Sequence, residues 1–252
     1  MMPEVNQIAE WIQALDRPDK QALRLAVDGL ISVLGTSSDT VRVLQNLLKE
    51  PQRKNRWPVA FVLAHASQPT PELLQILLDT LDDPDPDIRW AIILLLARLT
   101  KTNAAHLQLP LSLLVTGTAT QRRMVIYYLK ELRLQNELIV ETLLNALRDP
   151  DATVRVAAII TLKEHAVSLN GKKSLLELLV DDPDVRVQHA AAITLASLGS
   201  PSKEFLSALD QAAQSAQAPL KKAASAALRI LQEKKEVRPI RQLTSPLKRT
   251  SG

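Results

Sequence analysis

The stretch that decides the fold is DPDPDIRWAIILLLARL at residues 83–99. Two stretches of the same chain resemble it, DPDATVRVAAIITL at residues 149–162 and DPDVRVQHAAAITLASLG at residues 182–199. In each, an Asp-Pro-Asp turn leads into an apolar run whose spacing favours a helix. The prolines at 84, 150 and 183 are 66 and 33 residues apart, which indicates an internal repeat with a period of 33.

This period holds over nearly the whole chain. The position twelve residues after the proline is leucine in all seven copies: Leu30, Leu63, Leu96, Leu129, Leu162, Leu195 and Leu228. Two further apolar columns, four residues apart, precede the proline, and this spacing marks one face of a helix. Each repeat is therefore predicted to hold two helices joined by a short turn that contains proline.

Seven such repeats predict an all-α protein. A single helix pair cannot bury both of its faces, so stacked pairs would form a right-handed α-solenoid in one domain over residues 1–236. We expect the helix pairs near residues 4–35, 38–68, 71–101, 104–134, 137–168, 171–200 and 203–236. Residues 237–252 have four basic side chains, two prolines and no acidic side chain, which predicts a disordered basic tail.

The three Asp-Pro-Asp stretches resemble the HEAT repeat, in particular its short bacterial variety first noted in phycobilisome lyases. The resemblance covers residues 4–236, whereas the internal signatures of ankyrin and tetratricopeptide repeats are absent. It implies a structural ladder between units, formed by an acidic residue before each second helix and an arginine inside it. The arginines are Arg56, Arg89, Arg122 and Arg155, and the acidic positions are Glu50, Asp83, Asp149 and Asp182. Thr116 takes the acidic position before Arg122, so Arg122 is the arginine expected to be available to a partner.

Composition and charge limit the kind of protein that this chain can be. The chain has 252 residues, 46% hydrophobic and only 3% aromatic, and it has no cysteine for disulfides or thiolate metal sites. Its net charge of +4 combines −3 over residues 1–220 with +7 over residues 221–252, so the body is mildly acidic. The start of the sequence lacks the pattern of a secretory signal, and no apolar run is long enough to span a membrane. We therefore expect a cytoplasmic protein without a membrane partner.

No catalytic constellation is evident in the sequence. The four histidines lie in different columns of the repeat, and none forms a ligand pair at helical spacing: His65, His106, His165 and His189. The chain contains no His-Glu dipeptide, the pair that the HEAT-repeat enzyme deoxyhypusine hydroxylase uses for its metal. The six scattered glycines form no phosphate-binding loop. We predict no catalytic, metal or cofactor site and therefore no enzyme, and we expect His165, in a leucine column, to be buried with its hydrogen bonds made.

Two tryptophans point to a binding surface. Trp57 and Trp90 follow the arginine column directly, on the side of the second helix opposite its buried stripe. The resemblance implies that second helices line the concave surface of the stack, which would make the two rings neighbours there. Trp and Arg are enriched in binding hot spots. The predicted partner-binding strip is Trp57, Trp90, Arg56, Arg89, Arg122 and Arg123. The alternative is that both rings are packing filler, whereas Trp11, in a leucine column, is expected in the core.

These observations favour a non-catalytic scaffold that binds another protein on its concave surface, with an acidic or extended segment as a candidate ligand. One alternative is nucleic-acid binding through Arg122, Arg123 and the tail residues Arg238, Arg241, Lys248 and Arg249. Another, implied only by the resemblance, is an enzyme subunit like the phycobilin lyases. The sequence names no partner.

Overall fold

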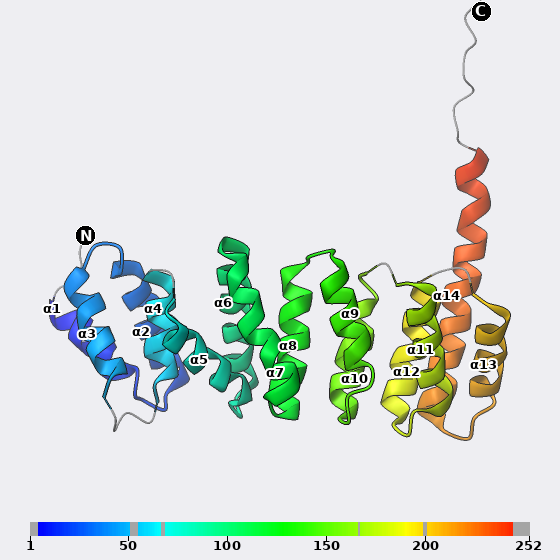
Figure 1. The fold of residues 1–252 in the computed structure, drawn as a ribbon, viewed down its shortest axis with the longest axis horizontal. Helices are drawn as coiled ribbons and strands as arrows, with labels where there is room; N and C mark the ends of the chain where they lie inside the picture. The colour runs from blue at the N-terminus through cyan, green and yellow to red at the C-terminus, as the bar shows by residue number, and fades with distance from the viewer. Residues whose placement is uncertain (1–4, 51–54, 67–68, 166, 199–200, 244–252) are drawn as a thin grey trace, which may run out of the picture. The chain divides into compact units, whose positions relative to one another are not determined.

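The structure, a computed structural model, describes residues 5–50, 55–66, 69–165, 167–198 and 201–243. Among these residues there are fourteen α-helices, two short 3-10 helices and no strand (Figure 1). The α-helices follow one another as seven pairs, one pair in each predicted repeat. The prediction of an all-α solenoid built from helix pairs is confirmed.

The first helices of the pairs are α1 (Val5–Ala14), α3 (Ser38–Leu48), α5 (Pro71–Asp79), α7 (Gln108–Thr116), α9 (Glu137–Ala146), α11 (Leu169–Asp181) and α13 (Lys203–Ala213). The second helices are α2 (Lys20–Val33), α4 (Trp57–Ala66), α6 (Pro86–Thr102), α8 (Ala119–Leu132), α10 (Ala152–Leu162), α12 (Val185–Ser197) and α14 (Ala218–Leu243). The 3-10 helices η1 (Thr80–Asp82) and η2 (Ala104–Leu107) follow α5 and precede α7.

The pairs group into two compact units where the sequence predicted one domain. The first unit is Met1–Leu132 and holds four pairs, and the second is Arg133–Gly252 and holds three. Within the first unit the second helices contact one another in the order α2, α4, α6, α8, and within the second unit α10, α12 and α14 do the same. Each unit therefore has a continuous layer of second helices, backed by the first helices.

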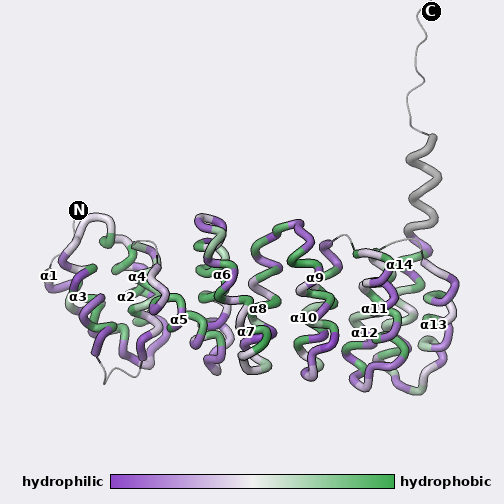
Figure 2. The backbone as a smooth tube through the Cα atoms, viewed as in Figure 1, coloured by the Kyte–Doolittle hydropathy of each residue, from purple (hydrophilic) through white to green (hydrophobic). Residues whose placement is uncertain are grey.

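The leucine column that identified the repeat forms the centre of each unit. Six of its seven members are buried, and the seventh, Leu228 in the last helix, is half-buried. Figure 2 shows hydrophobic and hydrophilic positions alternating along each helix, as expected where one face of a helix is buried. The core is almost wholly aliphatic, and Tyr128 is the largest fully buried side chain.

The Asp-Pro-Asp turns have a common hydrogen-bond pattern. The first Asp of each turn accepts a bond from the backbone N–H of the second, at 2.8 Å for Asp83, 2.8 Å for Asp149 and 2.9 Å for Asp182. The second Asp then caps the following helix by accepting from a backbone N–H of its first turn. The Asp after the proline therefore caps the second helix in all three of these repeats.

Trp11 has a more exposed place than its leucine column predicted. It is half-buried, and its indole ring lies directly on Gly29 of α2. A Cβ atom on Gly29 would lie 2.5 Å from Cε2 of this ring, so only glycine leaves room for it. The large ring thus packs the first helix of this pair against the second.

The C-terminal boundary also differs from the prediction. Helix α14 continues to Leu243, so residues 237–243 are helical although the sequence assigned them to a disordered tail. Residues 244–252 lie outside the described residues. No helix in the described part of the chain has the length and apolarity that crossing a membrane requires.

Candidate functional site

An exposed apolar surface follows the second helices of the first unit. Trp57 and Phe61 of α4 are half-buried, as is Tyr127 of α8, while Trp90 and Leu94 of α6 are 41% and 47% exposed. We call these five residues the second-helix strip. Its rings meet edge to face: Trp57 contacts Phe61 with centroids 6.4 Å apart, and Trp90 contacts Tyr127 at 6.3 Å.

The strip borders a hollow that we call the helix-face pocket, with a volume of about 590 Å³. Helices α2, α4 and α6 line it, and its apolar wall includes Val27, Trp57, Phe61 and Ile88. Charged side chains surround this wall: Lys20, Arg24, Asp28, Asp85 and Asp87. An apolar floor with a charged rim suits a side chain or peptide segment that has both characters.

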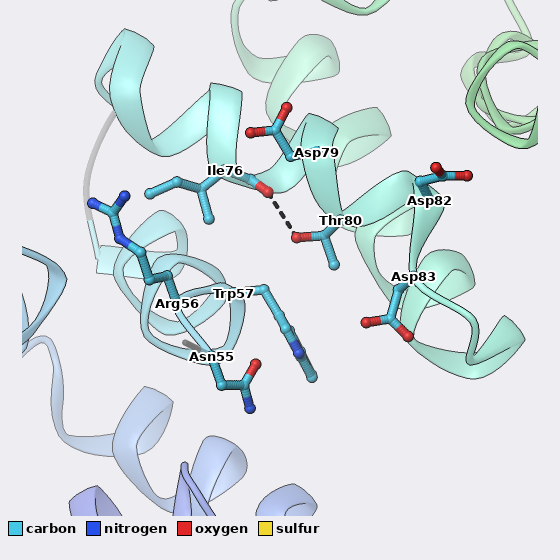
Figure 3. Close-up of a pocket in the computed structure, with 8 residues that line it drawn as sticks. All are labelled: Asn55, Arg56, Trp57, Ile76, Asp79, Thr80, Asp82 and Asp83. Carbon is cyan, nitrogen blue, oxygen red and sulfur yellow. Dashed lines mark hydrogen bonds between the residues drawn. The ribbon is translucent and has the colours of Figure 1, made fainter. Parts of the chain in front are cut away.

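Trp57 also lines a second hollow, the turn pocket, with a volume of about 420 Å³. The pocket lies where the start of α4 meets the end of α5 and η1, and its lining is Asn55, Arg56, Trp57, Ile76, Asp79, Thr80, Asp82 and Asp83. In Figure 3 the carboxylate of Asp83 points toward the indole of Trp57, whereas that of Asp82 points away from it. The dashed line marks the Thr80 hydroxyl donating to the carbonyl of Ile76 at 2.7 Å. Trp57 therefore stands between two pockets.

The arginine column of the predicted strip is bound to backbone carbonyls. Arg56 donates to the carbonyl of Leu48 from Nε at 3.1 Å and from Nη2 at 2.7 Å. Arg122 donates to the carbonyl of Gly117 at 2.9 Å, and Arg155 to those of Asp149 at 2.8 Å and Pro150 at 3.1 Å. These carbonyls lie at the end of a first helix or in the turn after it, where helical donors are lacking. These arginines thus fasten α4, α8 and α10 to the turns that precede them.

The predicted ladder between repeats is present at Arg155, but the expectation for Arg122 is wrong. Arg122 was expected to be available to a partner, but its guanidinium is hydrogen-bonded within the protein. In the pair with clear ladder geometry, Arg155 binds the carboxylate of Asp182 in the next repeat, 27 residues further on.

The ladder position that corresponds to Arg89 lacks a carboxylate. Adding 27 residues to Arg89 leads to Thr116, which has no carboxylate. Arg89 donates from Nη1 to the carbonyls of Asp83 and Pro84, the latter at 3.1 Å, but its buried Nε has no partner among the described residues. Thr116 therefore occupies the position at which Arg89, and not Arg122, would meet a carboxylate.

The remaining predicted site residues are dispersed. Trp57 and Trp90 belong to the same strip, but their ring partners are Phe61 and Tyr127, and no ring contact within the described residues joins the two indoles. Arg123 is half-buried on α8. Arg238 and Arg241 belong to α14 with side chains outside the described set, and Lys248 and Arg249 lie outside the described residues.

Phe61, Leu94 and Tyr127 were not predicted from the sequence. Their signal is the column four residues after the tryptophan column: Asp28, Phe61, Leu94, Tyr127, Ile160, Ile193 and Ala226. Five of these seven side chains are large and apolar although they lie on the face opposite the core. In the second unit, Ile160 is 42% exposed and Ile193 is half-buried, so the column stays apolar there without aromatic rings.

Within the described residues, no group of three or more His, Asp or Glu side chains is placed to hold a metal ion. His165 is buried as predicted, but its Nδ1 has no hydrogen-bond partner in the described structure, which corrects the expectation that its bonds are made. Burial lowers the pKa of His165 and, for the same reason, that of the half-buried His65.

The repeat pattern, the helix pairs and the turn geometry agree with a family comparison. The model of HEAT repeats matches residues 8–97, 40–130 and 140–229. The chain belongs to the HEAT repeat family. Its HEAT repeats thus extend through both compact units, and the resemblance found in the sequence is confirmed. HEAT repeats serve many unrelated roles, so membership fixes the fold and leaves the partner open.

Solved structures of repeat proteins resemble this HEAT repeat chain in fold. Escherichia coli YibA has a TM-score of 0.54 at 18% identity, over 90% of this chain and 94% of that one. Human deoxyhypusine hydroxylase in complex with glycerol has a TM-score of 0.42 at 17% identity, over 90% and 84% of the two chains. The CpcE–CpcF complex of phycocyanin lyase from Nostoc has 0.36 at 19%, over 92% and 95%. No curated protein sequence matches the chain.

Proposed function

We propose that the protein is a non-catalytic scaffold that binds a segment of another protein on the second-helix strip of its first unit. The observation that carries the proposal is the exposure of Trp90 and Leu94, next to a hollow that Trp57 and Phe61 line. Exposed apolar side chains that adjoin one another and a pocket are typical of protein-binding surfaces. Scattered ones, such as Val115 on α7, need no such explanation.

The packing alternative for the two tryptophans accounts for part of their surface only. Each ring touches one aromatic neighbour, yet Trp90 keeps 41% of its surface exposed and Trp57 borders two pockets. A ring that served packing alone would gain stability from being covered further. The remaining apolar surface supports a binding role.

The proposal is tested by crosslinking inside cells. A photo-crosslinking amino acid at Leu94 is expected to capture a partner protein, whereas the same group at the 88% exposed Val115 is not. Capture at Leu94 should then fall when Trp57→Ala and Trp90→Ala are combined. A matched control combines Val115→Ala with Leu138→Ala, which removes exposed apolar side chains from first helices. Capture that persists in the tryptophan variant would contradict the proposal.

The nucleic-acid alternative loses its main structural support, because Arg122 is engaged by the carbonyl of Gly117. What remains for it is Arg123 and the basic end of the chain. A mobility-shift titration with DNA and RNA at low salt tests it directly, since phosphate contacts strengthen as salt falls. The phycobilin-lyase alternative stays a prediction from the family resemblance.

A further inference from the structure

The charges that line the two pockets beside Trp57 are mainly negative. Among the described residues, six carboxylates and three cationic side chains line these pockets: Asp28, Asp79, Asp82, Asp83, Asp85 and Asp87 against Lys20, Arg24 and Arg56. A positively charged strip was predicted from the sequence, because the arginine column was expected to lie at the binding surface.

Two of the three cations are already bound within the protein. Arg56 donates to the carbonyl of Leu48 and, at 3.1 Å, to Oε1 of Glu72. Lys20 forms an ion pair with Asp85. Neither of these two cations is therefore readily available to an acidic ligand. The remaining cation that lines the pockets is Arg24.

Lys20 shows how these carboxylates receive a cation. It is the first residue of α2, yet its ammonium group reaches the start of α6, where it contacts Asp85 and lies 3.6 Å from Asp87. Its side chain remains 69% exposed, so this ammonium group sits at the open rim of the helix-face pocket. A cation from another molecule would find the same carboxylates beside the same aromatic wall.

Trp57 adds a second means of binding a cation. Its indole borders both pockets, and in Figure 3 the Asp83 carboxylate points toward it. A guanidinium or ammonium group over an indole face gains from the ring's electron density, and a carboxylate nearby adds to the attraction. Arginine and lysine also have long apolar stems that pack against rings such as Phe61.

We infer that the segment bound by the second-helix strip is a basic extended peptide, in which arginine or lysine side chains alternate with apolar ones. The inference rests on the proposed function and names the chemistry of its partner. The apolar side chains of the peptide contact Phe61, Trp90 and Leu94, and its cations meet the carboxylates around Trp57. The peptide is extended because the strip runs across consecutive repeats, with Trp57 on α4 and Trp90 on α6.

The test is a binding titration with the full chain, followed by fluorescence anisotropy. The probe is a labelled peptide of about twelve residues that repeats Lys-Leu-Arg-Ala, compared with one that repeats Glu-Leu-Asp-Ala. We expect the basic peptide to bind more tightly, and its affinity to fall as salt rises from ~50 to ~300 mM, because the rim charges are exposed to solvent.

Three variants make the test specific. Asp28→Asn with Asp87→Asn is expected to weaken binding of the basic peptide about five- to tenfold, because two exposed carboxylates are lost. Lys20→Gln is expected to strengthen it severalfold, because it releases Asp85 and Asp87 from their internal cation. The matched control, Glu141→Gln with Asp210→Asn, removes the same charge from the second unit and should leave affinity unchanged.

The outcomes separate this inference from the proposed function. If both peptides bind equally and lose affinity in Trp57→Ala, the strip binds peptides and the basic specificity is wrong. If neither peptide binding nor cellular capture responds to Trp57→Ala, both proposals fail. Because Trp57→Ala could disturb α4, the exposed residues Asp28, Asp87 and Lys20 decide the charge question independently. Unchanged affinity in all three of those substitutions overturns the inference.

Discussion

Arg155 and Asp182 bind one another through two parallel hydrogen bonds, each of 2.8 Å, across the boundary between two repeats of the second unit. Both side chains are nearly buried, at 10% and 2% exposure. The same arginine bonds to the carbonyls of Asp149 and Pro150, and the same carboxylate accepts from the backbone N–H of Asp184. One ion pair thus joins the turn before α10 to the turn before α12.

Asp182→Asn tests this connection. Asparagine keeps an acceptor for the N–H of Asp184 but leaves the Arg155 charge buried without its counterion. We expect the free energy of unfolding, measured by chemical denaturation, to fall by about 3 kcal/mol. The reason is that a buried charge without its partner keeps the cost of its desolvation but loses the compensating attraction. The exposed pair of Arg186 with Asp184 is the control, and Arg186→Gln should cost much less than Asp182→Asn, because solvent screens exposed charges. Equal effects of the two substitutions would contradict the ladder.

Thr116→Asp is expected to stabilise the first unit. Its carboxylate would take the place relative to Arg89 that Asp182 has relative to Arg155, and would offer an acceptor to the unpaired Nε. A hydrogen bond between this carboxylate and the buried Nε of half-buried Arg89 should add about 1 kcal/mol to the free energy of unfolding. Thr116→Asn supplies the shape without the charge and should add less. A thermal midpoint that Thr116→Asp leaves unchanged or lowers would show that Arg89 does not need the carboxylate.

Gly29→Ala is expected to destabilise the first helix pair. Its Cβ would lie 2.5 Å from Cε2 of Trp11, so the ring must move, and overpacking of this kind costs about 1–3 kcal/mol. Trp11→Leu, which restores the residue type of its column, should relieve the clash. In a double-mutant cycle the loss from Gly29→Ala should therefore be much smaller in the Trp11→Leu background. Additive losses would mean that the two residues do not interact.

His165 predicts a pH dependence of stability. Burial lowers its pKa below the 6.5 of an unfolded histidine, although Glu164 nearby acts in the opposite direction. As pH falls below about 6.5, His165 therefore binds a proton in the unfolded chain before it does so in the folded chain. The free energy of unfolding decreases as a result. His165→Leu should reduce this decrease and stabilise the protein, since Leu99 and Leu132 fill the same column. Unfolding midpoints at about pH 7.5 and pH 5.5 measure the difference; His65, whose pKa is also lowered, keeps its own share.

The periodic features of the fold were predictable from the sequence because each depends on local spacing. The leucine column, the capping Asp85, Asp151 and Asp184, and the turn prolines all act within one helix or one turn. In the sixth repeat, the buried positions of the first helix are shifted by one residue from the apolar columns of the sequence, so the periodic prediction fails there. In α11 the buried pair is Leu175 and Leu179, and Val180, which lies in an apolar column three residues before the proline and was expected in the core, is 50% exposed.

The candidate site was predictable in part. Trp57 and Trp90 stood out because aromatic residues are rare in this chain, whereas the apolar column of Phe61, Leu94 and Tyr127 was hidden among ordinary helical hydrophobic residues. Exposure separates the two kinds of apolar residue, and exposure depends on which neighbouring helices cover a side chain. The arginines were misread for a similar reason, since their carbonyl partners carry no signature in the sequence.

The sequence by itself determined the number of repeats, the two helices in each and the turns between them, because hydrophobic periodicity and proline punctuation act along the chain. Tertiary structure alone decided which charges remain at the surface. It placed Arg56, Arg89 and Arg122 against turn carbonyls, paired Arg155 with a carboxylate 27 residues away, and left aspartates around Trp57. The physical reason is that hydrogen bonds form between groups that packing brings within about 3 Å of one another, whatever their separation in the chain.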